Sequence, residues 1–421
     1  MRDILITLIV MGSLPFILAR PYIGILMLSW LGYMNPHRLS WGFAYHMPFS
    51  LIVAATLVVA IPFSREPKRI PMTPVTVMLI IFILWMGITT IFSINSQLAH
   101  EHLIKVIKIQ IGIFFTLMLM YKRERLHLLI WVIFLSIGFF GIKGGIFTIL
   151  TGGSQRVWGP PGTFIYGNNE IALAILMVVP FGYYLREMAS NKWVKRFLVA
   201  AVLLMVAASL GSQSRGAFLA ALAVAGFFWL KSPKKIITGT ISILALVVGF
   251  FFMPQSWHER MSTIETYQQD ASAMGRINAW TTAVHVAGDR LTGGGYQMWT
   301  RKVYSEYAPN PDDIHDAHSI YFEVLGEHGY IGLFLFLTMW VLTFFTASKT
   351  IRKTKNIEEL RWANILSRMV QVSMIAYATG GAFLGLAYFD LPYHLMTIVV
   401  LTQLIVKKHL ADIDAEKRLA T

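Results

Sequence analysis

The chain has 421 residues, of which 56% are hydrophobic and 14% are charged, and it contains no cysteine. A soluble domain carries about 25% charged residues, so this composition excludes an ordinary soluble protein and indicates a membrane protein. The net charge of +14 would favour nucleic-acid binding in a soluble protein. Here most of the excess lies in short loops between apolar runs, where it is a topology signal, and we expect no nucleic-acid partner.

Apolar runs recur along the whole chain at lengths that suit a hydrocarbon layer of about 30 Å. They are continuously apolar rather than alternating, which favours membrane helices over a barrel, because backbone groups in lipid must pair internally. The predicted spans are 49–63, 74–92, 104–120, 127–149, 170–185, 197–211, 216–230, 236–253, about 320–347, 364–388 and 392–406.

The N-terminal residues 3–34 allow two interpretations. They form either one span with a bent continuation or two short helices broken at Arg20–Pro21. One span gives about twelve helices with both termini in the cytoplasm, whereas two spans give about thirteen. We favour the former, so the expected fold is an all-α polytopic membrane protein of about twelve transmembrane helices.

Lysine and arginine gather in alternate connections, which marks the cytoplasmic side. The basic connections are 65–69, 122–125, 186–196, 231–235 and 349–361, together with the tail 407–418. The other connections, expected to face the periplasm or the cell exterior, are 35–48, 93–102, 151–169, 211–216, 254–318 and a short turn at 390–392.

We therefore expect three parts. Residues 1–253 hold the first helices, up to about ten, with short loops; residues 254–318 form a large periplasmic region that contains helices; residues 319–421 hold the last two or three spans and a cytoplasmic tail. The middle part carries arginines, interleaved aromatic residues, three consecutive glycines and the run His315-Asp316-Ala317-His318. A polytopic protein that keeps its polar residues in one extramembrane segment is expected to act there.

Arg215 stands in the short outward turn 211–216 between two apolar helices. An arginine near the membrane is costly unless it is paired, so function is the default hypothesis. The alternative is a snorkelling arginine at a helix end. Arginine suits phosphate because its planar fork donates two parallel hydrogen bonds to anionic oxygens.

His318 lies where the chain re-enters the membrane. An imidazole there titrates near neutrality and can take a proton from a hydroxyl; the alternative is a helix-capping or interfacial histidine. His315 and His318 have HxxH spacing, but neither an HExxH motif nor a third ligand accompanies them, so we expect no metal site.

Two other polar patterns favour structural interpretations. Gly293–Gly295 could cradle a phosphate with backbone amides, but no lysine and serine or threonine follow, so we expect a tight turn. The pair Asp312-Asp313 is not part of a DxD motif, and we interpret it as a solvated face.

Two patterns resemble motifs of the bacterial O-antigen ligases. The stretch from Arg215 to Leu219 is similar to their RxxxL motif. His318-Ser319, followed by nine residues and then Gly329-x-x-Gly332, is similar to their H[NSQ]x9Gxx[GTY] motif. Both motifs fall on the outward side of the predicted topology.

Further features extend this resemblance over nearly the whole chain in its layout. Arg276 with Trp280, and the outward stretch 160–169, are also similar to the family. The N-terminal region resembles a subgroup of O-glycosylation ligases from exosortase-type gene clusters, which leaves the acceptor open.

The resemblance implies a GT-C-like glycosyltransferase at the periplasmic face of the bacterial inner membrane. It would move O-antigen polysaccharide from undecaprenyl diphosphate to a hydroxyl of the lipid A-core oligosaccharide, with inversion at the anomeric carbon and with no metal or other cofactor. Its partners would be the lipid-linked polysaccharide, the lipid A-core acceptor and membrane lipids.

The resemblance also implies roles for individual residues. Arg215 and Arg276 would compensate the charge that grows on the departing diphosphate, and His318 would be the general base. A second set is expected to bind diphosphate or sugar, namely Arg290, Arg156, Asn169, His315 and Trp280.

Three alternatives stay open. An O-antigen or exopolysaccharide polymerase and a protein O-oligosaccharyltransferase would use the same donor. A polysaccharide-lipid transporter would instead place ionisable residues at mid-membrane on broken helices. Lys143 is the main charge at mid-span here, so the sequence favours catalysis at the interface.

Overall fold

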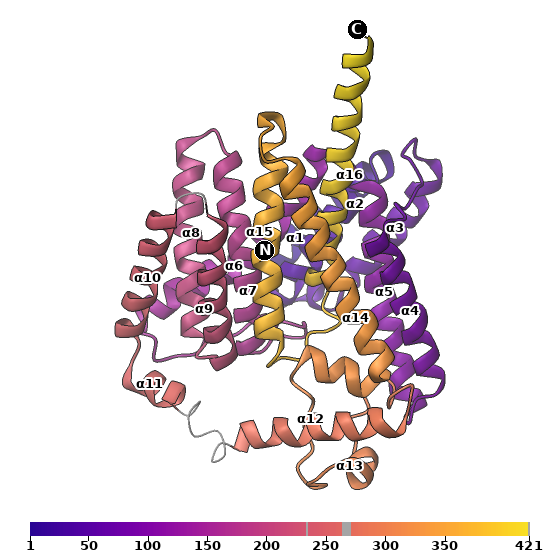
Figure 1. Ribbon diagram of the computed structural model, residues 1–421, viewed down its shortest axis with the longest axis vertical. Coiled ribbons are helices and arrows are strands. Elements are labelled where there is room, and N and C mark those ends of the chain that lie inside the picture. The colour runs from indigo at the N-terminus through magenta and orange to yellow at the C-terminus, as the bar shows by residue number, and fades with distance from the viewer. Residues whose placement is uncertain (233–234, 263–270, 420–421) are drawn as a thin grey trace.

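The computed structural model describes residues 1–232, 235–262 and 271–419, and within them the fold is an all-helical bundle (Figure 1). Helices make up 78% of the structure, and no strand occurs in the described ranges. The predicted all-α class is confirmed.

The bundle is built from long helices that run between its two ends. They are α1 (Arg2–Ala19), α2 (Tyr22–Met34), α3 (Phe49–Phe63), α4 (Pro74–Ile91), α5 (Ser96–Leu119), α6 (Arg123–Leu150), α7 (Asn168–Met188), α8 (Lys192–Gly211), α9 (Arg215–Lys231), α10 (Lys235–Phe252), α14 (Ile320–Lys353), α15 (Arg361–Gly381) and α16 (Asp390–Leu419). Shorter or crossing helices are α11 (Gln255–Ser262), α12 (Ala271–Asp289) and α13 (Arg301–Tyr307), with 3-10 turns at Pro36–Leu39, Phe43–His46 and Glu358–Leu360.

Several of these helices can cross a bilayer. Within the described residues, seven are long and apolar enough, namely α1, α4, α5, α6, α7, α8 and α14, while α2 and α3 are shorter apolar helices. A multi-pass membrane protein is therefore supported, and the count of about twelve spans stays a prediction.

The favoured single span over residues 3–34 is wrong. The structure has the alternative, two helices, because α1 ends at Ala19 and α2 begins at Tyr22. Arg20 adopts φ −141° and ψ 87°, outside the helical region. Proline disfavours helical backbone at the residue before it and has no amide to donate, so Pro21 explains the break.

The N-terminus lies beside the connection 35–48. Asp3 Oδ1 accepts hydrogen bonds from the amides of Gly42 and Ala44, each at 3.1 Å. A single span would have placed these two segments at opposite ends of the bundle, so this contact is a direct consequence of the second helix.

The basic connections gather at one end of the bundle. Arg125 pairs with Glu66 at 2.6 Å and thereby ties the start of α6 to the connection after α3. Arg361 pairs with Glu187 at 3.1 Å and ties the start of α15 to the end of α7. The hydrogen bonds from Arg125 hold the pKa of the Glu66 carboxyl below its ordinary value.

The remaining connections meet at the other end. The amide of Val157 donates to the carbonyl of Gly211 at 3.2 Å, and the amide of Ile94 donates to the carbonyl of Gly294 at 2.9 Å. Segments far apart in the sequence are thus brought together, and their alternation with the basic connections agrees with the predicted topology. The C-terminus lies away from this end, beyond the far end of the bundle (Figure 1).

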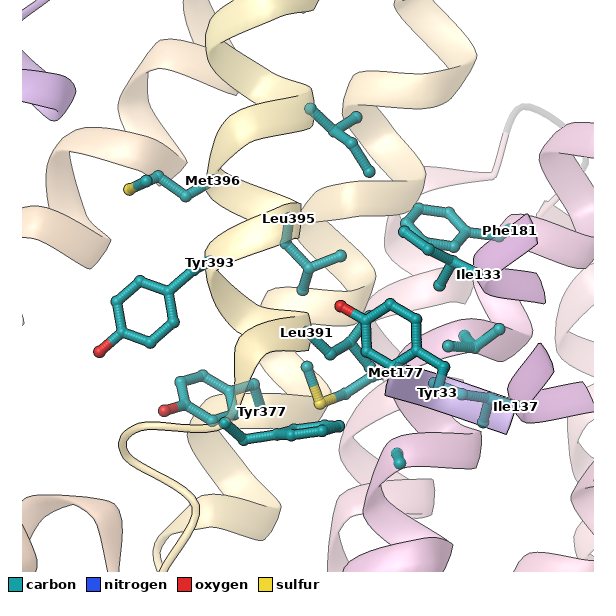
Figure 2. Close-up of a cluster of buried hydrophobic side chains, with 14 of the residues drawn as sticks. Tyr33, Ile133, Ile137, Met177, Phe181, Tyr377, Leu391, Tyr393, Leu395 and Met396 are labelled. Carbon is teal, nitrogen blue, oxygen red and sulfur yellow. The ribbon is translucent and has the colours of Figure 1, made fainter. Parts of the chain in front are cut away.

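The core of the bundle is apolar and is centred on α7, of which 72% is buried over its apolar window. Figure 2 shows side chains of α2, α6, α7, α15 and α16 packed together; those labelled are Tyr33, Ile133, Ile137, Met177, Phe181, Tyr377, Leu391, Tyr393, Leu395 and Met396. By contrast only 17% of α1 is buried, and it exposes apolar side chains such as Leu8 and Phe16. An apolar exterior of this kind suits contact with lipid.

Helix α12 lies across the end of the bundle opposite the C-terminus, between α13 and the start of α14 (Figure 1). Helix α14 breaks at Gly329, which has φ 68° and ψ −174°. The residues 320–328 therefore form a short helical segment that packs near α12, and the longer part continues into the bundle. This arrangement positions the candidate site.

Candidate functional site

A loop that leads into α14 is held in place by α12. The indole nitrogen of Trp280 donates to the carbonyl of Ala317 at 2.7 Å, and its ring stacks on Phe322 with centroids 4.9 Å apart and planes inclined by 9°. Asn278, two residues before Trp280, donates to the carbonyl of Asp313 at 2.9 Å. Helix α12 thus holds the loop that carries His318 at two points, Asp313 and Ala317.

His318 is half-buried and has a left-handed backbone, with φ 43°. This conformation costs about 1–3 kcal/mol for a residue other than glycine, and such strain clusters at functional sites. Burial, and next the positive charge of Arg276, lower the pKa of the His318 imidazole below its ordinary value. A neutral imidazole that can accept a proton is therefore favoured at neutral pH.

Arg276, near the start of α12, is close enough to His318 for its charge to act on the imidazole. Its charge acts on the His318 imidazole and also on the carboxylate of Glu170. Glu170 lies in the first turn of α7, where its carboxylate folds back over Gly167 so closely that a side chain at Gly167 would collide with it. The arginine thus links α12, α7 and the histidine loop electrostatically.

A cavity of about 300 Å³ opens beside His318. Its polar lining consists of Glu170, Gln297, Asp316, His318 and Glu323, and its aromatic lining consists of Phe164, Tyr166 and Trp299. The lining comes from the connection 151–167, from α7, from the segment after α12, from the start of α14 and from the connection between α15 and α16. The volume lies at the lower end of the range for ligand pockets.

The sequence interpretation missed the carboxylates of α14. Glu323 Oε2 accepts a hydrogen bond from the amide of Ala387 at 3.1 Å. Glu327 is fully buried; its two oxygens accept from the amide of Gln297 at 2.8 Å and from the hydroxyl of Tyr388 at 2.7 Å. Two acids spaced by four residues in an apolar span are rare and would have been a signal.

A cation near the cavity was also missed. The ammonium of Lys105, on α5, lies 4.0 Å from the centroid of the Phe164 ring. Lys105 contacts the Phe164 ring but is not itself part of the cavity lining. Its position on a predicted span gave no indication of this contact, which arises from packing between α5 and the connection 151–167.

Arg215 begins α9 at the same end of the bundle. The hydroxyl of Ser214 caps this helix by accepting from the amide of Ala217 at 3.1 Å. The preceding turn is tied to the start of α7, because Asn168 donates to the carbonyl of Ser212 at 2.8 Å. Arg215 is half-buried and lies outside the lining of the cavity.

Arg156 and Asn169 belong to the same neighbourhood as Arg215. Arg156 Nε donates to the side-chain oxygen of Gln213 at 3.4 Å, within the turn before α9. Asn169 is half-buried in the first turn of α7, next to Glu170. Both are close in sequence or space to cavity residues, although neither lines the cavity.

Arg290 and His315 are engaged elsewhere. Arg290 donates to the carbonyls of Phe92 at 2.6 Å and Gly293 at 3.1 Å. It follows Arg276 by 14 residues, which corresponds to roughly 21 Å along a helix. His315 Nε2 pairs with Asp313 Oδ1 at 2.7 Å on a largely exposed loop. The structure therefore brings neither residue into the cavity lining.

The glycine run forms a docking turn, as expected. The amides of Gly294 and Gly295 donate to the carbonyls of Gly326 and Glu327 at 2.8 and 2.9 Å. A side chain at Gly293 would place its Cβ 2.6 Å from the carbonyl oxygen of Gly326. These amides are used to hold α14, so they do not point at a phosphate. Among the described residues, no three His, Asp or Glu side chains are grouped as metal ligands.

Comparison with known families places this site within a recognised segment. Residues 200–337 match the family model described as O-antigen ligase. This segment includes Arg215, Arg276 and His318 together with both motifs. Residues 1–190 match a family of unknown function (DUF5935). A search of curated proteins found no match.

Proposed function

Because residues 200–337 place this chain in the O-antigen ligase family, we propose that it transfers O-antigen polysaccharide from undecaprenyl diphosphate to a hydroxyl of the lipid A-core oligosaccharide. Family membership supports glycosyl transfer of the ligase or polymerase type, with lipid-linked substrates at a membrane. The observation that carries the finer proposal is the juxtaposition of His318, with its lowered pKa, and Arg276 beside one cavity.

The proposed reaction is a direct displacement at the anomeric carbon. The acceptor oxygen forms the new glycosidic bond, and the bond between that carbon and the phosphate oxygen breaks. The electron pair leaves with the diphosphate, the configuration inverts, and the hydroxyl proton passes to His318. A positioned general base of this kind contributes about 10²–10⁴-fold to a rate.

The departing diphosphate requires compensation for its growing charge. Arg276 is close enough to His318 to act on its pKa, and Arg215 begins a helix at the same end of the bundle. Guanidinium groups bind phosphate oxygens in a bidentate manner, and in a site with little water they stabilise developing charge strongly. We assign these two arginines to the diphosphate in place of a metal ion.

The site is assigned to the periplasmic face of the bacterial inner membrane. It lies at the end of the bundle opposite the basic connections, which the positive-inside rule assigns to the cytoplasm. Both substrates carry lipid anchors in the same leaflet, so a site at the bilayer surface reduces the encounter to a problem of orientation.

A reconstituted reaction tests this proposal. The purified protein in liposomes would receive undecaprenyl-diphosphate-linked polysaccharide and lipid A-core, and the acceptor would be followed by mass. We expect the acceptor to gain the polysaccharide mass in the presence of EDTA. Turnover that chelator abolishes and magnesium restores would overturn the assignment of the arginines.

The same assay separates the alternatives. A pilin-like protein that gains mass while lipid A-core does not would indicate a protein O-oligosaccharyltransferase, and extension of the donor alone would indicate a polymerase. Movement of the lipid-linked polysaccharide across protein-containing vesicles, without any transfer, would indicate a transporter.

A further inference from the structure

We propose that the cavity beside His318 is the acceptor-sugar subsite, and that Glu323 binds a hydroxyl group of that sugar. This inference rests on the proposed function and deepens it, because it separates the acceptor's place from the donor's diphosphate. Three independent features of the cavity carry it: the charge of its lining, its aromatic walls and the way in which Glu323 is held.

The charge of the lining disfavours a diphosphate. Glu170, Asp316 and Glu323 line the cavity, and no lysine or arginine is part of the lining. A diphosphate in this cavity would therefore meet no cation of the lining to compensate its charge, which is costly in a poorly solvated site. Sugar hydroxyls, by contrast, can form hydrogen bonds with a carboxyl group whether it is ionised or protonated.

The walls and volume suit a sugar ring. Phe164, Tyr166 and Trp299 line the same cavity as the carboxylates. Aromatic rings offer an apolar face to the C–H side of a sugar, while Tyr and Trp keep a polar edge for hydrogen bonding. A cavity of about 300 Å³ suits a terminal sugar residue, with the rest of the acceptor outside.

Glu323 is held so that part of its carboxylate stays available. The amide of Ala387 donates to Oε2, and a carboxyl group keeps further positions for hydrogen bonds in either protonation state. Gly385 also lines the cavity, and a Cβ at this position would lie 3.6–3.7 Å from the carboxylate of Glu323. The absence of a side chain at Gly385 therefore leaves room over the carboxylate.

This placement sets the two substrates on either side of His318. The acceptor hydroxyl would lie in the cavity between His318 and Glu323. The diphosphate would lie towards Arg276, whose charge reaches His318 but which is not part of the cavity lining. An imidazole between them is positioned to receive the proton as the hydroxyl attacks.

The test measures apparent KM for each substrate in the reconstituted reaction. Glu323→Gln keeps the shape of the side chain and replaces the carboxyl group by an amide, and Gly385→Ala fills the space above it at ordinary van der Waals distance. Asp312→Asn is the matched control, because Asp312 is an exposed carboxylate of the same extramembrane region that does not line the cavity.

We expect Glu323→Gln and Gly385→Ala each to raise the apparent KM for the acceptor, the former by about 10- to 100-fold, the range for a buried polar group that loses its hydrogen-bond partner. The apparent KM for the donor should change less than about twofold, and Asp312→Asn should resemble the wild type. Glu323→Asp, which retains a carboxylate, should recover part of the acceptor KM.

Two results would overturn the inference while the proposed function stands. One is a rise in the donor KM alone; the other is an unchanged acceptor KM in both cavity variants. If the wild-type protein transfers nothing to any acceptor, the proposed function fails, and the acceptor subsite fails with it. Thermal unfolding of each purified variant distinguishes a lost contact from a lost fold.

Discussion

The two ends of α12 each have an arginine, and the two arginines have different surroundings. At the first end, Arg276 acts on His318 and Glu170 at the edge of a cavity. Just beyond the other end, Arg290 donates to two backbone carbonyls, those of Phe92 and Gly293. In one region the charge of an arginine acts on two ionisable side chains, and in the other the arginine joins the end of α12 to the end of α4.

This comparison separates an arginine that is held by backbone carbonyls from one whose charge acts on ionisable side chains. The carbonyls of Phe92, at the end of α4, and of Gly293, after α12, accept hydrogen bonds from Arg290. The charge of Arg276 acts instead on the imidazole of His318 and the carboxylate of Glu170. Residue type alone does not distinguish the two, because both are arginines in one polar segment.

The largest expected effect separates two histidines of the loop. His318→Asn should lower kcat by about 10²–10⁴-fold, because a positioned base is lost. Asparagine tolerates a left-handed backbone, so the loop should keep its shape. His315→Asn should remain near wild type, since its ion pair with Asp313 is largely exposed and such pairs contribute about 0–1 kcal/mol. Ligation kinetics measure both; equal losses would contradict the assignment of the base.

The second-largest expected effect is a difference in kcat between variants of Arg276 and of Arg290. Arg276→Gln should reduce kcat by about 10²–10³-fold, the usual loss when one group that stabilises developing charge is removed. Arg290→Gln should keep kcat within a few-fold and instead lower stability by about 1 kcal/mol, because its carbonyl contacts are partly exposed. Kinetic measurements should therefore show the larger loss in Arg276→Gln, and thermal unfolding should show the loss of stability expected for Arg290→Gln. The reverse pattern would show that Arg290, and not Arg276, faces the diphosphate.

A third effect concerns stability at the break in α14. Gly329→Ala should destabilise the protein by about 1–3 kcal/mol, because φ 68° is strained for alanine. The new methyl group would also collide with the carbonyl of Leu291. Gly288→Ala, in the last turn of α12, is the control, since nothing lies within 4 Å of its Cβ and alanine favours helix. Thermal unfolding midpoints measure both, and equal midpoints would mean that the break does not require glycine.

The fold class and the alternation of the connections could be predicted because apolar length and basic loops are local properties of the sequence. Arg276, Trp280 and His318 were singled out in the sequence, and in the structure α12 holds the loop that carries His318. For residues 3–34 the sequence analysis favoured one bent span over two helices, because a proline can either bend a helix or end it.

The meeting of carboxylates from α7 and α14 in one cavity could not be predicted from such local patterns. Glu170 and Glu323 are 153 positions apart and line one cavity because α7 and the start of α14 are neighbours in the fold. The engagement of Arg290 likewise depends on the carbonyl of Phe92, almost 200 positions away. These pairings arise from tertiary packing and cannot be predicted from periodicity or loop charge.

The smallest expected effect is a shift in the pH profile of kcat/KM when Arg276 is replaced, and it tests whether Arg276 influences the basicity of His318. Burial, and next the positive charge of Arg276, lower the pKa of His318, so the neutral base persists to lower pH than it would without them. Arg276→Gln removes that contribution, so the pKa of His318 should rise. The acidic limb of the profile of kcat/KM against pH should then move to higher pH, because free-enzyme groups govern that limb. Arg290→Gln should leave the limb in place. An unmoved limb in Arg276→Gln, with kcat still reduced, would mean that Arg276 serves the diphosphate alone and that burial sets the basicity of His318.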